Sequence, residues 1–279
     1  CIMTDKIPNL EVFLLSTELK KIKLLISYDG TDYCGWQKQK EHAHASDKPS
    51  LQGTMESALS KLFNETIGLN ASGRTDAGVH AIGQVGDFTT SRPLPKDLCW
   101  ALRSLLPESI VVKKAWIAPG EFHSTLSSFK KTYRYWIWNH PRQTALLHRY
   151  SYWLRQPLDL DYLNQQAQIL IGEHDFKSFQ CVGTPVASTV RQIHSIRWSR
   201  RNSSLVQFEV TGNGFLKQMV RNIVGIQLDL LRKSQPIETI DKILKAKDRS
   251  EGGATAPPQG LYLKKVYYPR SLDIQCREI

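Results

Sequence analysis

The stretch KIKLLISY (residues 21–28) predicts the first strand of the fold. Its apolar side chains Ile22, Leu24 and Ile26 fall on every second residue, and Lys21 and Lys23 fall on the other face. A period of two is typical of a strand with one face buried and the other in water. The dipeptide Asp29-Gly30 follows directly and favours a turn, so the strand is expected to end there.

Outward from this strand, the same kind of pattern predicts two similar series of elements. Ser50 is expected to cap a helix, because apolar residues follow it at helical spacing. Further strands are expected at 67–71, 84–89, 110–117, 132–139, 190–198, 206–211 and 261–268, and further helices at 96–106, 160–171, 215–232 and 237–246.

Each half of the chain therefore reads β-α-β-β-α-β, with one extra helix in the second half. This order is typical of the ferredoxin-like unit, in which two helices cover one face of a four-stranded sheet. We expect an α+β fold made of two ferredoxin-like halves, residues 21–122 and 123–279, behind an N-terminal extension, residues 1–20. The halves are expected to form one extended, mixed but mostly antiparallel sheet, with helices on one face and a cleft between the halves.

The composition excludes several classes of protein. A chain of 279 residues that is 41% hydrophobic and 23% charged can bury an ordinary globular core. It contains no apolar run of 18 residues, and no signal peptide is visible, so we expect no membrane association. Its five cysteines are scattered and never form a CxxC pair, which favours a reducing compartment and a cytoplasmic location.

The charge of the chain indicates a polyanionic partner. The formal net charge is +11, and residues 122–158 contain no Asp or Glu although they are rich in Lys, Arg, Tyr and Trp. Interleaved cations and aromatics suit a nucleic-acid surface, where phosphates are neutralised and bases stack. The same pattern also fits a strand with aromatics in the core and cations in water, and charge alone leaves both interpretations open.

The segment GRTDAGVHA (residues 73–81) is the most unusual in the chain. Gly73 and Gly78 bracket a short polar group, so the backbone can turn sharply and another molecule can approach closely. Asp76 is the one carboxylate between Glu65 and Asp87, and a nearby cation such as Arg74 would favour its ionised form, as a nucleophile requires. Taken alone, however, the segment favours an Asx turn in which the aspartate caps its own backbone.

Six motifs in order resemble the tRNA pseudouridine synthase A family. They are YDGTDYCGWQ (28–37), SLQGTMESAL (50–59), GRTDAGVHA (73–81), KTYRYWIWN (131–139), NGFLKQMVRNIVG (213–225) and GLYL (260–263). The resemblance extends from about residue 21 to residue 270.

The resemblance implies a function and a set of site residues. It implies that uridine is isomerised to pseudouridine in the anticodon stem-loop of tRNA, at tRNA positions 38–40, by a homodimer. It assigns Asp76 as the catalytic aspartate, Tyr133 as the tyrosine against the target base and Arg221 as the partner of the aspartate. It also assigns Arg74 to RNA binding near the flipped nucleotide. Because the base is kept and nothing is oxidised, one acid suffices, and no cofactor or metal is expected.

The sequence departs from the family pattern at two places. Ser124 and Thr125 stand where the family commonly has a small residue and then an arginine, so one cation facing the RNA is missing. The loop 39–50 is also longer than usual. Two alternatives stay open at this point: a metal-dependent hydrolase, since His80 follows Asp76 by four residues, and an RNA-binding protein without catalytic activity.

Overall fold

The computed structural model describes residues 19–38 and 47–279 of the chain. Most of the expected N-terminal extension, residues 1–20, and most of the 39–50 loop lie outside these residues. None of the helices in the described ranges is long and apolar enough to cross a membrane.

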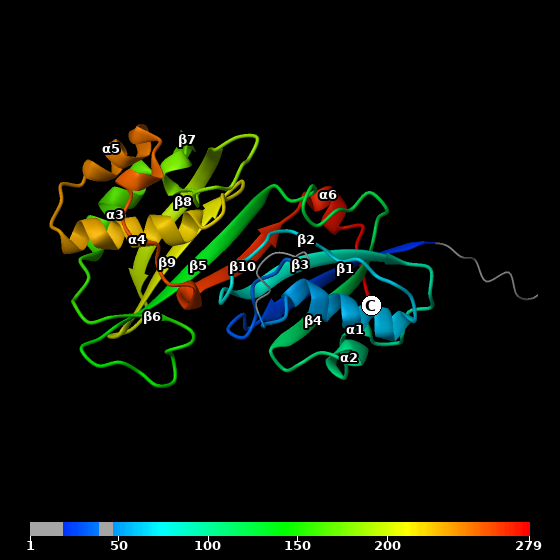
Figure 1. Cartoon of the computed structure of the whole chain (residues 1–279). Coiled ribbons are helices and arrows are strands. Elements are labelled where there is room, and N and C mark those ends of the chain that lie inside the picture. The colour runs from blue at the N-terminus through cyan, green and yellow to red at the C-terminus, as the bar shows by residue number, and fades with distance from the viewer. Residues whose placement is uncertain (1–18, 39–46) are drawn as a thin grey trace, which may run out of the picture.

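The strands form one sheet that runs through the whole molecule (Figure 1). Its order is β11-β4-β1-β3-β10-β5-β9-β8-β7, with β2 paired to β3 and β6 paired to β5. The pairs β3–β10 and β5–β6 are parallel and the other pairs are antiparallel, so the expected mixed, mostly antiparallel sheet is confirmed. The strands are β1 (Lys20–Tyr28), β2 (Asn70–Ala71), β3 (His80–Thr90), β4 (Ile110–Ala118), β5 (Lys130–Asn139), β6 (Tyr152–Leu154), β7 (Gly172–Asp175), β8 (Val190–Arg200), β9 (Leu205–Gly212), β10 (Leu261–Tyr267) and β11 (Arg277–Glu278).

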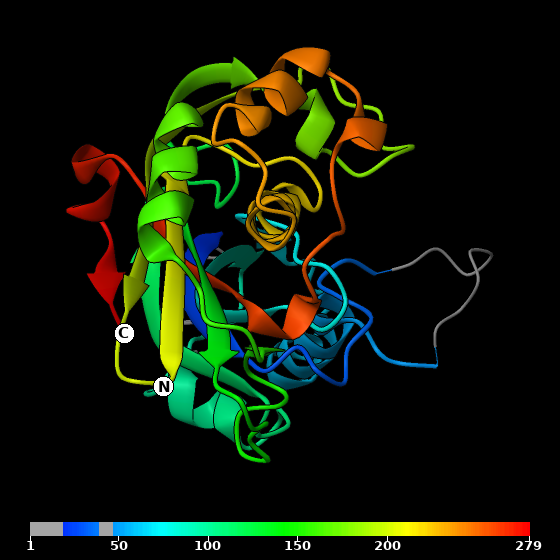
Figure 2. The same cartoon turned by 90° about the vertical axis from the view of Figure 1, so that its left-hand side faces the viewer.

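The core lies between the sheet and the longer helices. Ile22, Leu24 and Ile26 of β1 are fully buried, as their alternation predicts. Figure 2 shows α1 and α4 on one side of the sheet and α6 on the opposite side. The helices are α1 (Leu51–Phe63), α2 (Leu98–Arg103), α3 (Leu160–Ile169), α4 (Met219–Arg232), α5 (Thr239–Ala246) and α6 (Arg270–Asp273), with three short 3-10 turns at Lys177–Phe179, Arg249–Glu251 and Pro258–Gly260.

The expectation that the helices cover one face needs a correction at α6. Lys23 lies on the opposite face of β1 from Ile22 and Leu24, and its ammonium lies 2.7 Å from the carboxylate of Asp273 in α6. The Lys23 ammonium also lies within 5.3 Å of the ring centroids of Trp116, Phe122 and Tyr268. This cation and its aromatic neighbours fix α6 on the other face of the sheet.

Several boundaries differ from the sequence pattern for backbone reasons. The helix expected at 215–232 begins at Met219, because Gln218 has φ +61° and a left-handed residue cannot continue an α-helix. Residues 215–218 instead line a cavity. Gly172 does follow α3, but with φ +112° it opens strand β7, which the pattern did not predict.

The parallel pair β3–β10 joins the two parts of the sheet. His80 pairs with Tyr262 and Ala81 with Leu263, so β10 of the second half is hydrogen-bonded to β3 of the first. Strand β3 begins directly after the segment 73–79. That segment therefore lies where the two halves of the chain meet.

Candidate active site

Asp76 lies on a turn that enters β3, held against the segment before α1. Its backbone forms an isolated bridge with Gly35, and Trp36 donates its N–H to the carbonyl of Thr75 at 3.0 Å. Gly35 has φ +111°, and a Cβ there would lie 2.8 Å from the Thr75 carbonyl oxygen. Only glycine fits this position without strain, so the close approach of the two loops depends on it.

Buried hydrogen bonds hold this turn from below. Gln84, fully buried in β3, accepts from the Ser72 hydroxyl at 2.8 Å and donates to the Gly73 carbonyl at 2.7 Å. The Tyr28 and Thr75 hydroxyls share a buried hydrogen bond of 2.8 Å. Satisfied buried polar groups of this kind fix a single backbone conformation. The carboxylate of Asp76 is thus carried on a rigid support.

The cation that contacts Asp76 is Arg221 of α4. Its Nη1 lies 3.0 Å from Asp76 Oδ2, and its Nε donates to the carbonyl of Ala256 at 2.8 Å. The Arg221 side chain is 12% exposed and that of Asp76 is 23% exposed. The guanidinium is therefore largely buried behind the carboxylate, while the carboxylate remains open to solvent.

Asp76 opens into a cavity of about 880 Å³ between the two halves of the chain, which we call the Asp76 cavity. Tyr133 of β5 lines this cavity and is 8% exposed. Its ring packs edge-on against that of Phe215, with 5.1 Å between the ring centroids. Burial, together with the charge of Asp76, raises the pKa of the Tyr133 phenol, so the hydroxyl stays protonated at neutral pH. The cavity thus combines a carboxylate, a guanidinium and an aromatic ring.

Arg74 lines the same cavity but does not contact Asp76 as the sequence spacing suggested. Its side chain is exposed, and the ion pairs of the described residues join Asp76 to Arg221 instead. Arg74 precedes Asp76 by two residues and contributes an exposed side chain to the lining of the cavity. The cation that holds the carboxylate comes from a helix 145 residues further along the chain.

Sequence reasoning missed Lys131 as a site residue. Its ammonium donates a hydrogen bond to the Ser72 carbonyl, and it lies 3.8 Å from where a Cβ on Gly73 would be. Burial lowers the pKa of Lys131. The available signal was its position two residues before Tyr133, because alternate residues of a strand share a face.

Two further residues bear on the expectations. Thr125, where the family commonly has arginine, lines the Asp76 cavity, and its hydroxyl donates to the Ala71 carbonyl at 2.6 Å. His80 turns away from Asp76: its Nδ1 accepts from the Gly30 N–H at 3.2 Å, and its Nε2 lies 3.0 Å from the Arg149 carbonyl. The pairing of histidine with aspartate on which the hydrolase alternative rested is not formed.

Comparison with known proteins identifies the class that this fold and site define. A family model described as tRNA pseudouridine synthase matches residues 24–124 and 166–269. The chain therefore belongs to the tRNA pseudouridine synthase family, and it is an isomerase that converts uridine to pseudouridine in tRNA. Both alternatives, the hydrolase and the non-catalytic RNA-binding protein, give way to this activity.

The similar relatives are more specific. The chain is 54% identical to tRNA pseudouridine synthase A of Bdellovibrio bacteriovorus over 263 residues, covering 93% of this chain and 99% of that protein. It is 38% identical to tRNA pseudouridine synthase A of Pseudomonas aeruginosa over 274 residues, covering 98% and 94%. A solved structure of a Cbf5-Nop10-Gar1 complex aligns with a TM-score of 0.33 and 11% identity, over 85% of this chain and 56% of that one.

Proposed function

We propose that Asp76 is the nucleophile of the isomerisation. The N1–C1′ bond of the uridine breaks while the carboxylate takes C1′, the base turns, and C5 then forms the new bond to C1′ as the carboxylate leaves. The C5 proton passes to solvent and N1 gains a proton, so the composition of the base is unchanged. The support is the open carboxylate of Asp76 held by the largely buried Arg221.

Tyr133 and Arg74 are proposed to hold the nucleotide. A uridine inside a stem must be flipped out, at a cost of a few kcal/mol, before its C1′ can reach Asp76. Stacking of the base on an aromatic ring contributes about 1–3 kcal/mol. The support for this role of Tyr133 is that the residue lines the cavity, and its raised pKa favours stacking over proton transfer. Arg74, exposed at the same cavity, would contact the RNA beside the flipped base.

We propose uridines 38–40 of the anticodon stem-loop as the targets and a cytoplasmic homodimer as the active form. These assignments follow the resemblance to the tRNA pseudouridine synthase A family, and the names of the relatives support tRNA as the substrate. Mapping pseudouridines in tRNA from cells with and without the gene tests the positions. Loss of pseudouridine elsewhere, with positions 38–40 unchanged, would contradict them.

We also propose that residues 21–122 and 123–279 are two ferredoxin-like domains. In the first half, β1, β2, β3 and β4 lie in the order β4-β1-β3-β2. In the second half, β5, β8, β9 and β10 lie in the order β10-β5-β9-β8. The same arrangement, last-first-third-second, supports a repeated unit joined at β3–β10.

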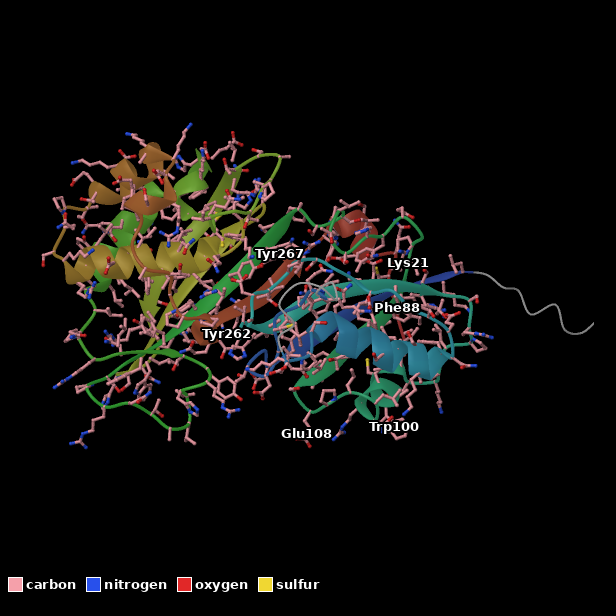
Figure 3. The ribbon with its side chains drawn as sticks, viewed as in Figure 1. Lys21, Phe88, Trp100, Glu108, Tyr262 and Tyr267 are labelled. Carbon is pink, nitrogen blue, oxygen red and sulfur yellow. The ribbon has the colours of Figure 1, made fainter. Side chains whose placement is uncertain are left out.

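The role of Asp76 is tested by Asp76→Asn. This change keeps the shape of the side chain and removes its charge, so we expect turnover to fall by more than about a thousandfold while tRNA still binds. Release of tritium from tRNA labelled at C5 of uridine measures turnover. Glu108→Gln is the matched control, because Glu108 lies exposed in the first half (Figure 3) and does not line the Asp76 cavity. Wild-type turnover in Asp76→Asn would remove the aspartate from its role.

A pair of variants tests the role of Tyr133. If stacking dominates, Tyr133→Phe keeps most of the activity and Tyr133→Ala loses about five- to a hundredfold more. Equal losses in the two variants would assign the role to the hydroxyl instead.

A further inference from the structure

A second aromatic pocket lies outside the Asp76 cavity. Trp138 of β5 and Trp153 of β6 are direct partners in the register of this parallel pair, so their side chains project from the same face of the two strands. They border a cavity of about 190 Å³, which we call the tryptophan pocket. We propose that the tryptophan pocket binds an unpaired nucleobase of the tRNA substrate, at a site separate from the flipped uridine.

Both indole rings are held in place before any ligand arrives. The Nε1–H of Trp138 donates to the Arg142 carbonyl at 2.9 Å, and that of Trp153 donates to the His140 carbonyl at 2.9 Å. Trp153 is nevertheless 37% exposed. A ring that is fixed at its polar edge and open on its surface can stack on a base with little further loss of conformational entropy.

The other side chains of the pocket suit the edge of a base. Gln143 and Gln259 both line it, together with Thr144 and His148. Neither glutamine side chain has a hydrogen-bond partner among the described residues. A free amide offers a donor and an acceptor side by side, which is the pattern that the edge of a nucleobase matches.

The charge around the pocket suits the phosphates of RNA. The segment 140–156, which carries most of the pocket, contains no Asp or Glu, and it includes Arg142, Arg149 and Arg155. Arg142 and Arg155 form no ion pair with the residues that the structure describes, and both are exposed. Free guanidinium groups beside an aromatic pocket favour a nucleotide over an apolar ligand.

One segment of the chain connects the two sites. Pro257 and Gln259 line the tryptophan pocket, whereas Pro258 between them lines the Asp76 cavity. An RNA that places a uridine over Asp76 therefore passes within reach of the tryptophan pocket. The inference rests on the activity on tRNA and needs no assumption about the chemical role of Asp76.

The test compares Trp153→Ala with Trp153→Phe and with Trp100→Ala, using an unmodified tRNA transcript. Trp100 is the matched control because it is 70% exposed on α2, in the other half of the chain (Figure 3). We expect Trp153→Ala to raise the KM and the Kd for tRNA by about five- to a hundredfold, with kcat within about twofold of wild type. Trp153→Phe retains an aromatic face and should restore most of the affinity, and Trp100→Ala should behave as wild type.

A second variant keeps the proposal testable if Trp153→Ala fails to fold. Gln143→Ala changes an exposed side chain without a partner, and we expect it to raise the KM for tRNA by about two- to tenfold. An unchanged KM in a folded Trp153→Ala, or in Gln143→Ala, would overturn the inference. So would a change of oligomeric state with unchanged tRNA affinity, which would assign this face to a protein contact. Failure of the Asp76 assignment would give a different result, because it would appear as normal turnover of bound tRNA in Asp76→Asn and not as a change in tRNA affinity.

Discussion

At the scale of single residues, the site depends on the shape of one guanidinium. Arg221 uses Nε on the Ala256 carbonyl and Nη1 on Asp76, so two separate groups are held by one planar fork. A lysine carries the same charge but as a single point, and it cannot hold both partners in this geometry. Replacing Arg221 with lysine should therefore change the orientation of the Asp76 carboxylate.

Arg221→Lys is accordingly expected to lower kcat by about ten- to a hundredfold, the value of one lost hydrogen bond to a charged group. The Kd for tRNA should stay within about threefold, because Arg221 is largely buried and faces Asp76. Single-turnover experiments with excess enzyme measure the loss of catalytic rate, and filter binding measures the Kd for tRNA. Equal losses of rate and binding would show that Arg221 contacts the RNA directly.

Thr125 offers the opposite experiment, the addition of a cation. Thr125→Arg places a guanidinium at the wall of the Asp76 cavity, so we expect the Kd for tRNA to fall by about three- to tenfold at low salt. The slope of log Kd against log salt should steepen by about one unit for one added phosphate contact. Thr125→Val is the control, since it removes the bond to the Ala71 carbonyl without adding charge. An arginine variant with the salt slope of the wild type would contradict the expectation.

At the scale of elements, the sequence predicts the central strands and helices well and the special backbone positions poorly. Strand β1 and helix α1 follow from alternation and from the Ser50 cap, whose hydroxyl accepts the Gly53 N–H at 3.1 Å. The late start of α4 at Met219 depends on the left-handed Gln218, and glutamine carries no signal for that conformation. The local sequence pattern indicates burial and turns, whereas tertiary contacts decide where a residue such as Gln218 adopts an unusual backbone conformation.

The site shows the same division. Asp76 stands out locally, between its two glycines, but its contact with Arg221 spans 145 residues of sequence. Only the ordered motifs of the family indicated that contact beforehand. Lys131 and Gln84 were missed because a polar side chain in a strand is expected to face solvent. Their actual partners are the carbonyls of Ser72 and Gly73, which only the folded turn brings close to them.

Gly225 in α4 provides a prediction at this scale. A Cβ at Gly225 would lie 1.9 Å from the Ala254 carbonyl oxygen and 2.8 Å from the Ala256 nitrogen. Gly225→Ala must therefore push segment 254–256 off the helix, and Ala256 is the residue whose carbonyl holds Arg221. We expect a loss of about 1–3 kcal/mol in the free energy of unfolding, together with a lower kcat. Urea unfolding and the tritium assay check this. Gly120→Ala, with nothing within 4 Å of the added carbon, should change neither quantity.

At the scale of the whole molecule, the two halves are joined by more than the sheet. Tyr150, in the loop between β5 and β6, donates to the Asp29 carboxylate at 2.9 Å, and Tyr262 donates to the Tyr150 carbonyl at 2.9 Å. His80 lies between them, 1% exposed, stacked on the Tyr262 ring at 4.7 Å and 3.0 Å from Asp29. The start of β3, close after Asp76, is thus enclosed by groups from both halves of the chain. Asp76 and Arg221 should keep their spacing only while the halves remain docked.

This buried histidine predicts how stability depends on pH. Burial lowers the pKa of His80 below its ordinary value of 6.5, and this effect outweighs the attraction of Asp29. Below pH 6.5 the unfolded chain therefore binds a proton at His80 that the folded chain does not bind, so stability falls as the pH drops through this value, by at most about 1.4 kcal/mol at pH 5.5.

Burial alone would raise the pKa of Asp29, but hydrogen bonds from Thr31 and Tyr150 hold this pKa below its ordinary value. Its contribution to stability is retained above about pH 4 and does not change within this window. Urea unfolding at pH 7.5 and 5.5 should show a larger loss for the wild type than for His80→Asn, each as a single transition because the halves share β3–β10. An equal loss of unfolding free energy in both proteins would show that His80 does not cause the pH dependence.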